Sequence, residues 1–226
     1  MSAERETERD GGHARRPTWR EVAAMPGRRL FVAVPLADDA VRTITELVDG
    51  IRSPGDAARR ERGRDVRWVR LDGLHLTLRF IGPTVEDRVP AALTAVHEAA
   101  EAHEAFDLRI DGGGAFPSLD RPRALWLAVA GGAAQLGDLA ADVDAALVRA
   151  GWPASDRPFQ PHLTLARSDG VPAGSEVARR LAAAATGLDL RSAVDRLVLF
   201  ESVTGGGPAR YVEVETVRLR PATGAQ

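Results

Sequence analysis

The tetrapeptide His-Leu-Thr-Leu occurs twice in this chain of 226 residues, at 75–78 and at 162–165. In a β-strand, alternate residues face opposite sides, so each copy directs two leucines to one face and a histidine and a threonine to the other. The leucines can anchor the strand in a core, while the imidazole and the hydroxyl remain outside it. The repeat therefore predicts two similar strands that each present a polar pair.

The surroundings of the two copies are similar as well. The stretch LFVAV (30–34) precedes the first copy and LWLAV (125–129) precedes the second, at nearly the same separation along the chain as the two histidines. Apolar runs alternate with helical patterns in both halves. This order predicts a duplicated strand-helix-strand-helix-strand unit.

The expected elements follow from hydrophobic periodicity and from turn residues. We expect strands at about 29–35, 66–70, 74–81, 105–111, 124–130, 162–167, 194–202 and 209–220, and helices at about 38–52, 85–103, 133–150 and 174–186. The glycine clusters DGGGAF (111–116) and TGGGPAR (204–210) follow strands and are interpreted as turns, because neither matches a phosphate-binding or dinucleotide fingerprint.

The domain boundaries follow from composition. Residues 1–28 are polar and charged without periodicity, and we expect a loosely attached tail. Residues 29–220 are expected to form one two-lobed domain, with His75 in one lobe and His162 in the other, followed by a short tail at 221–226.

Composition restricts the kinds of function. Hydrophobic residues make up 44% of the chain, enough for a packed core, and no apolar run approaches the roughly 20 residues of a transmembrane helix. The first residues are charged where a signal peptide would be apolar, so we expect a cytoplasmic protein and, by default, a monomer. The absence of cysteine excludes disulfides, thiolate nucleophiles and cysteine-ligated zinc.

Charge does not point to one partner. The net charge of −2 offers no overall attraction to nucleic acid, so a polyanion would require a local patch. The segment 52–70 is rich in arginine and is either a solvated loop or a contact for an RNA backbone. Arginine supplies every basic residue of this chain, which weakens any argument that a given arginine was chosen over lysine.

Two histidines on opposite sides of a site suit displacement at phosphorus. One imidazole removes a proton from the nucleophile and the other protonates the leaving oxygen. With ordinary pKa values near 6.5, one can be neutral and the other protonated near neutral pH, and threonine hydroxyls can donate hydrogen bonds to the phosphate. The pattern thus predicts a metal-independent phosphoesterase that needs no cofactor.

Two other interpretations of the repeated histidines are possible. A single strand histidine is more often structural, but a duplicated one is not expected at a core position. A zinc site would need further ligands, and none falls at a suitable spacing beside His75 or His162. His97 and His103 are expected on a helix and at its end, exposed to solvent, and His13 belongs to the tail.

Longer stretches resemble a known family. The segments RRLFVAVPL, LHLTLRFIG, RALWLAVAG, DRPFQPHLTLAR and LVLFESVTGGGPARYVEV are similar, in this order, to the bacterial RNA 2′,3′-cyclic phosphodiesterases, also called 2′-5′ RNA ligases, which are two-histidine phosphoesterases. The resemblance covers about residues 28–220.

The resemblance implies an α+β fold of two lobes, with antiparallel sheets flanking a central cleft and helices outside. It also implies hydrolysis of RNA 2′,3′-cyclic phosphate ends, or of nucleoside cyclic phosphates, to 2′-phosphomonoesters, in some members with 2′-5′ joining of RNA ends. His75 and His162 become the acid/base pair and Thr77 and Thr164 the phosphate donors, without a metal or cofactor.

The resemblance further places Arg167 near the phosphate or base and Phe80 near the nucleoside. Strand alternation, however, puts both on the leucine side, so each reaches the histidine side only if its strand ends or bulges first. The alternatives are a substrate with another cyclic or 2′-5′ phosphate, such as an ADP-ribose cyclic phosphate or a 2′-5′ oligonucleotide, or a non-catalytic module that binds RNA ends.

Overall fold

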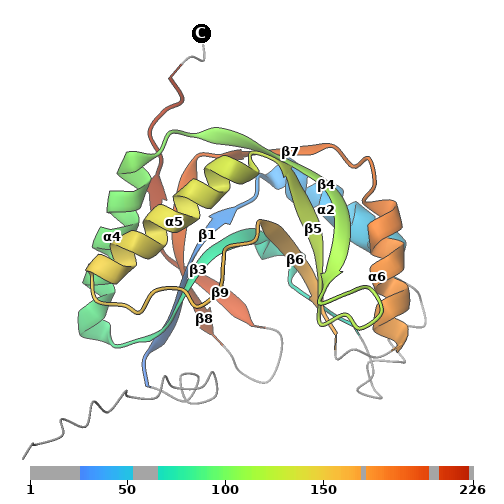
Figure 1. Ribbon diagram of the computed structural model, residues 1–226, viewed down its shortest axis with the longest axis horizontal. Helices are drawn as coiled ribbons and strands as arrows, with labels where there is room; N and C mark the ends of the chain where they lie inside the picture. Colours follow the sequence, from blue (N-terminus) through green and yellow to red (C-terminus); the bar gives the residue numbers. More distant parts are fainter. Residues whose placement is uncertain (1–25, 53–65, 169–171, 204–208, 224–226) are drawn as a thin grey trace, which may run out of the picture.

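The computed structural model describes residues 26–52, 66–168, 172–203 and 209–223. Within these ranges the strands form two antiparallel sheets (Figure 1). The four-stranded sheet has the order β3-β1-β8-β9 and the five-stranded sheet the order β2-β6-β5-β4-β7. This is the α+β fold with antiparallel sheets and outer helices that the sequence predicts.

The element bounds agree with most of the expected ranges. The strands are β1 (Arg28–Pro35), β2 (Arg67–Trp68), β3 (His75–Thr84), β4 (Phe106–Phe116), β5 (Ala124–Gly131), β6 (His162–Arg167), β7 (Leu190–Val194), β8 (Arg196–Val203) and β9 (Arg210–Arg218). The α-helices are α2 (Asp38–Ile51), α4 (Val89–Ala102), α5 (Ala133–Arg149) and α6 (Pro172–Ala184). Short 3₁₀ helices lie at η1 (Leu71–Gly73) and η2 (Glu86–Arg88).

Strand alternation in β1 separates two apolar clusters. Leu30, Val32 and Val34 belong to the main core. Phe31 and Ala33 point to the other side of the sheet and join a second, smaller cluster. The strand is therefore apolar on both faces, because each face packs in an apolar cluster.

The helices cover one face of each sheet. Helices α4 and α5 pack together, α4 contacts β8 and β9, and α5 contacts β3, so this pair covers the four-stranded sheet. Helices α2 and α6 contact each other, α2 contacts β7 and α6 contacts β4, so they cover the five-stranded sheet. Figure 1 shows these pairs on the two outer sides of the molecule.

The two sheets are not the two sequential halves of the chain. The four-stranded sheet combines β1 and β3 with β8 and β9, and the five-stranded sheet combines β2 and β4 with β5, β6 and β7. His75 begins β3 in the first sheet, and His162 begins β6 in the second. The histidines thus lie in different sheets, although each sheet combines strands from both halves of the sequence.

The interpretation of DGGGAF as a turn is wrong, because these residues form the second half of β4. The register shifts between Ile110 and Gly113, and Gly112 has a φ of +82°, so a bulge uses the conformational freedom of glycine. Gly114 lies under the ring of Trp126, where a Cβ would come within 2.6 Å of the indole. The glycines permit this packing within a strand.

Three further differences concern smaller segments. The sequence does not predict strand β7, which has only five residues and lies a short turn after α6. The segment 221–226 was expected to be a short tail, but Thr223 within it contacts the fold. Its backbone N–H donates a hydrogen bond to the carboxylate of Glu104 at 3.1 Å. Most of the expected N-terminal tail, of TGGGPAR and of the arginine-rich 52–70 segment lies outside the described residues.

None of the described helices combines the length and the apolar character that crossing a membrane requires.

Candidate active site

The first motif lies on β3, and its register with β1 shows which face each side chain occupies. His75 lies opposite Pro35, Thr77 opposite Ala33 and Phe80 opposite Phe31. Directly opposite residues share a face, and the three β1 residues are two positions apart, so they share one face too. We call the side of each sheet that carries the histidine and threonine its motif face.

A bulge in β3 brings Phe80 to this face. Val32 pairs with Arg79 while Ala33 pairs with Thr77, so β3 contains one extra residue, Leu78. Without this residue, Phe80 would share the leucine side. The ring of Phe80 lies 5.8 Å from that of Phe31, and 64% of Phe80 is exposed. The structure therefore places Phe80 beside the first motif.

The second motif on β6 has the same geometry. His162 lies opposite Ala128, Thr164 opposite Trp126 and Arg167 opposite Ala124. The register shifts between Leu125 and Trp126, which leaves Leu165 as the extra residue. Arg167 thus lies on the motif face of the five-stranded sheet, as Phe80 does on that of the other.

The leucines of both motifs are buried on the opposite faces. Leu76 and Leu163 are 1% and 0% exposed, respectively, and both belong to the main core. The core therefore fixes the direction in which the histidines and threonines point.

The two imidazoles are held by the same hydrogen bond. His75 Nδ1 lies 2.8 Å from the carbonyl oxygen of Gly73, and His162 Nδ1 lies 2.6 Å from that of Gln160. A carbonyl can only accept, so Nδ1 carries the proton and donates in both rings. This bond persists whether the ring is neutral or protonated, so Nε2 is the atom that gains and loses a proton.

His75 lies in an aromatic cluster. Its ring centroid is 5.1 Å from Phe31, 5.5 Å from Phe200 and 4.9 Å from Tyr211, whose plane is nearly perpendicular to it. Burial among these rings lowers the pKa of His75 from its ordinary value, and the hydrogen bond to Gly73 opposes this effect. His75 is therefore biased towards the neutral form.

His162 has a smaller aromatic neighbourhood. Phe116, at the end of β4, lies 5.1 Å from it with an interplanar angle of 88°, nearly the same arrangement as Tyr211 has with His75. Trp126 packs on Phe116 at 5.0 Å. The sequence does not identify Phe116 and Tyr211 as neighbours of the histidines, because nothing in their spacing relates them to either motif.

The two motif strands lie side by side. Strands β3 and β6 are in contact at the junction of the two sheets, near the centre of Figure 1. Arg79, at the β3 bulge, reinforces this junction. Its guanidinium forms an ion pair with Asp144 on α5 and donates to the carbonyl of Pro153, at 2.5 Å, in the segment that leads to His162.

His97 and His103 are not simply exposed to solvent, as expected from the sequence. His97 Nε2 is 2.6 Å from a carboxylate oxygen of Glu215, and His103 Nε2 is 2.8 Å from one of Asp142. Each carboxylate lies on a neighbouring element that sequence spacing does not reveal. His97 and His103 thus each pair with a carboxylate, whereas the hydrogen bonds described for His75 and His162 go to backbone carbonyls.

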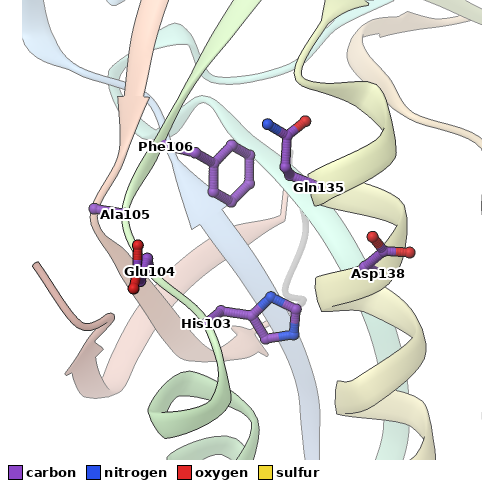
Figure 2. Close-up of a pocket in the computed structure, with 6 residues that line it drawn as sticks. All are labelled: His103, Glu104, Ala105, Phe106, Gln135 and Asp138. Carbon is purple, nitrogen blue, oxygen red and sulfur yellow. The ribbon is translucent and has the colours of Figure 1, made fainter. Parts of the chain in front are cut away.

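A surface pocket of about 280 Å³ lies between the start of β4 and α5 (Figure 2). Its lining residues are His103, Glu104, Ala105, Phe106, Gln135 and Asp138. Phe106 and Phe116 are the two ends of β4, so the pocket is remote from His162. Its two carboxylates make it unsuitable for a phosphate.

No group of three or more metal-ligating side chains is found in the part of the chain that the structure describes.

Sequence comparison identifies relatives that are named RNA 2′,3′-cyclic phosphodiesterases. The chain is 38% identical over 109 residues to an RNA 2′,3′-cyclic phosphodiesterase of Aeropyrum pernix, which covers 48% of this chain and 61% of that protein. It is 32% identical over 197 residues to a protein of the same name from Geobacillus stearothermophilus, which covers 86% of this chain and 57% of that protein. The chain thus spans about three fifths of the length of these relatives.

Structure comparison shows the same fold in E. coli LigT complexed with 3′-AMP, with a TM-score of 0.67 and 26% identity over 85% of this chain and 98% of that one. The family model of the 2′-5′ RNA ligase superfamily matches residues 33–206, which include both motifs. This chain belongs to the 2′-5′ RNA ligase superfamily.

Proposed function

We propose that this protein hydrolyses RNA 2′,3′-cyclic phosphate ends to 2′-phosphomonoesters without a metal, with His75 and His162 as the acid/base pair. The observation that carries the proposal is the matched geometry of the motifs. Each imidazole donates from Nδ1 to a backbone carbonyl two residues earlier, and each shares its motif face with a threonine two residues later. The relatives named RNA 2′,3′-cyclic phosphodiesterase support the same reaction.

The proposed reaction is a single in-line displacement. A neutral imidazole accepts a proton at Nε2 from water while the water oxygen bonds to phosphorus. The bond from phosphorus to O3′ breaks, and the protonated imidazole of the other histidine donates its Nε2 proton to O3′. The product is a 2′-phosphomonoester, and the protons of the pair have exchanged places. With an RNA 5′-hydroxyl in place of water, the same step forms a 2′-5′ linkage.

The remaining motif residues would bind the substrate. Thr77 and Thr164 lie on the motif faces beside the imidazoles and can donate hydrogen bonds to the non-bridging phosphate oxygens. Phe80 offers an exposed ring on which a nucleobase can stack. Arg167 is exposed on the opposite sheet and can contact the phosphate or the base.

We expect the protein to convert nucleoside 2′,3′-cyclic monophosphates, and an oligonucleotide with a cyclic phosphate end, to 2′-phosphomonoesters in excess chelator. Catalysis by two imidazoles needs no divalent ion, whereas a metal hydroxide mechanism does. Product analysis by chromatography and ³¹P NMR checks this.

An ADP-ribose cyclic phosphate and a 2′-5′ oligonucleotide are tested in parallel, and a marked preference for either would replace the proposed substrate. Binding of RNA ends without turnover would identify a non-catalytic module.

Replacing either histidine with alanine, His75→Ala or His162→Ala, should lower kcat by about 100-fold or more, because each removes a proton-transfer group. The double variant should lose little more than the single ones, since both groups act in one step. The control is His97→Ala, which removes a histidine paired with Glu215 on the outer surface. Near-full activity in either motif variant would contradict the two-histidine mechanism.

The pH dependence should follow from the partly buried position of His75 among aromatic rings. We expect kcat/KM to be bell-shaped in pH, with one macroscopic limb below the ordinary histidine value of about 6.5, since burial lowers the pKa of His75. His75→Ala should remove that limb from the residual activity.

The lowered pKa of His75 also predicts how the free energy of unfolding changes with pH. Neutral His75 stabilises the folded state above about pH 6.5, and this contribution is lost as pH falls from there through the lowered pKa, because the unfolded chain binds the proton first. Chemical unfolding between pH 5 and 8 measures this slope. A slope unchanged in His75→Ala would show that His75 is not the group that titrates.

A further inference from the structure

An arginine lies on the core face of the first motif strand. Arg79 of β3 is directly opposite Val32 of β1, which belongs to the main core, and only 13% of the Arg79 side chain is exposed. A guanidinium that leaves water loses its hydration, and its burial is costly unless an opposite charge and hydrogen bonds replace that hydration. The partners of Arg79 therefore show what the buried charge holds in place.

Each nitrogen of the Arg79 guanidinium has a partner. Nε donates to Oδ1 of Asp144 on α5, and Nη1 donates to the backbone carbonyl of Phe80 in the same strand. Nη2 donates to the carbonyl of Pro153 at 2.5 Å. Oδ1 of Asp144 also accepts the backbone N–H of Ser155 at 3.0 Å. One ion pair thus joins β3, α5 and the chain that follows α5.

This part of the chain leads directly to the second motif. We call residues 150–161, between α5 and β6, the α5–β6 segment. Figure 1 shows it running from the end of α5 past β3 to the start of β6. It contains three prolines, which fix their own φ and restrict the residue before each of them, and Phe159 packs against the main core. The segment is therefore stiff, and holding Pro153 and Ser155 restricts the residues that follow them.

The end of the α5–β6 segment orients the second imidazole. The carbonyl of Gln160 accepts the hydrogen bond from His162 Nδ1 at 2.6 Å. A displacement of the segment would move this carbonyl and turn the ring. Arg79 itself lies four residues after His75 on the strand of the first motif. One side chain thus connects the strand of His75 with the segment that orients His162.

Packing of α5 on β3 does not account for these contacts. An ion pair that only fastened the helix to the strand would need Asp144 alone, yet Arg79 and Asp144 each bind the backbone of the α5–β6 segment as well. The start of the segment is held separately, because Arg88 of η2 lies 4.0 Å from the ring centroid of Trp152. Arg79 and Asp144 therefore act on the part after Trp152, which continues to the second motif.

We propose that Arg79 and Asp144 are positioning residues that set His162 in line with His75. This rests on the proposed function, in which the two Nε2 atoms act on opposite sides of one phosphorus. Reacting groups that are misplaced by about 1 Å lower the rate steeply, by about 100-fold in some enzymes. Both side chains lie on the core side of β3, away from the motif face, so they act through the α5–β6 segment and not on the substrate.

The test is a double variant, Arg79→Met with Asp144→Leu. Apolar side chains of similar size in place of a buried ion pair often leave stability unchanged or raise it, whereas the contacts to the α5–β6 segment are lost. kcat and KM are measured with a nucleoside 2′,3′-cyclic monophosphate, and the unfolding temperature is measured in parallel. We expect kcat to fall by about tenfold or more, KM to change by less than about threefold, and the unfolding temperature not to fall.

Two single variants accompany it. Arg79→Lys keeps a positive charge beside Asp144 but lacks the planar fork that reaches three partners, so we expect a folded protein with kcat lowered by roughly threefold or more. This variant tests the proposal even where the double variant does not fold. The control is Arg149→Met, which removes an exposed ion pair of α5 with Glu98, 2.6 Å long, and should leave kcat and stability unchanged.

A further measurement does not depend on activity. The proton on His162 Nδ1 exchanges with water when its hydrogen bond to Gln160 opens, and NMR measures the exchange rate. In the double variant this exchange should be faster, while that of the Nδ1 proton of His75 should not change.

Wild-type kcat in the double variant, or an unchanged exchange rate at His162, would overturn the positioning role. Failure of the wild-type protein to hydrolyse the substrate would instead overturn the proposed function, and the exchange measurement would still decide whether Arg79 and Asp144 hold His162 in place.

Discussion

The alternation of side chains along β3 and β6 is the constraint on which the candidate site depends. Each strand supplies leucines to the core and polar groups to the opposite face. Both are possible in one strand because successive side chains point to opposite faces. Burial of Leu76 and Leu163 leaves the imidazoles no other direction. The bulges at Leu78 and Leu165 then add one residue to each strand and bring the sixth residue of each strand, Phe80 or Arg167, to the side of the histidines.

The two motifs are alike in their strands and different in their surroundings. The hydrogen bonds from Nδ1 to Gly73 and Gln160 fix both rings in the same way. Around His75, however, Phe31, Phe200 and Tyr211 form a cluster that lowers its pKa. Around His162 the aromatic contact comes from Phe116. The proposed mechanism needs one neutral and one protonated imidazole, and different environments favour different protonation states in the two rings.

How much the sequence predicted depends on whether a feature is local. The period of two and the repeated tetrapeptide predicted β3, β6 and the faces of His75 and His162, because alternation needs no knowledge of neighbouring strands. The side on which Phe80 and Arg167 lie depends on a bulge, and a bulge is visible only in the register with β1 or β5.

Tertiary contacts also explain the errors. The glycines of DGGGAF suggested a turn, but they serve a bulge and the packing of Trp126 against Gly114 within β4. His97 and His103 were expected to be solvated, and their carboxylate partners come from β9 and α5. The assignment of strands to sheets, in which β8 and β9 join β1 and β3, cannot be inferred from the order of elements alone.

The central claim is that the two imidazoles act on a single phosphate. The most direct test is NMR of the histidine rings during titration with adenosine 2′-monophosphate, a product of the proposed reaction. The account predicts that the resonances of His75 and His162 both shift with one common dissociation constant, while those of His97 do not shift. A shift of only one motif histidine, or two different constants, would show that the motifs do not share a site and would contradict the account.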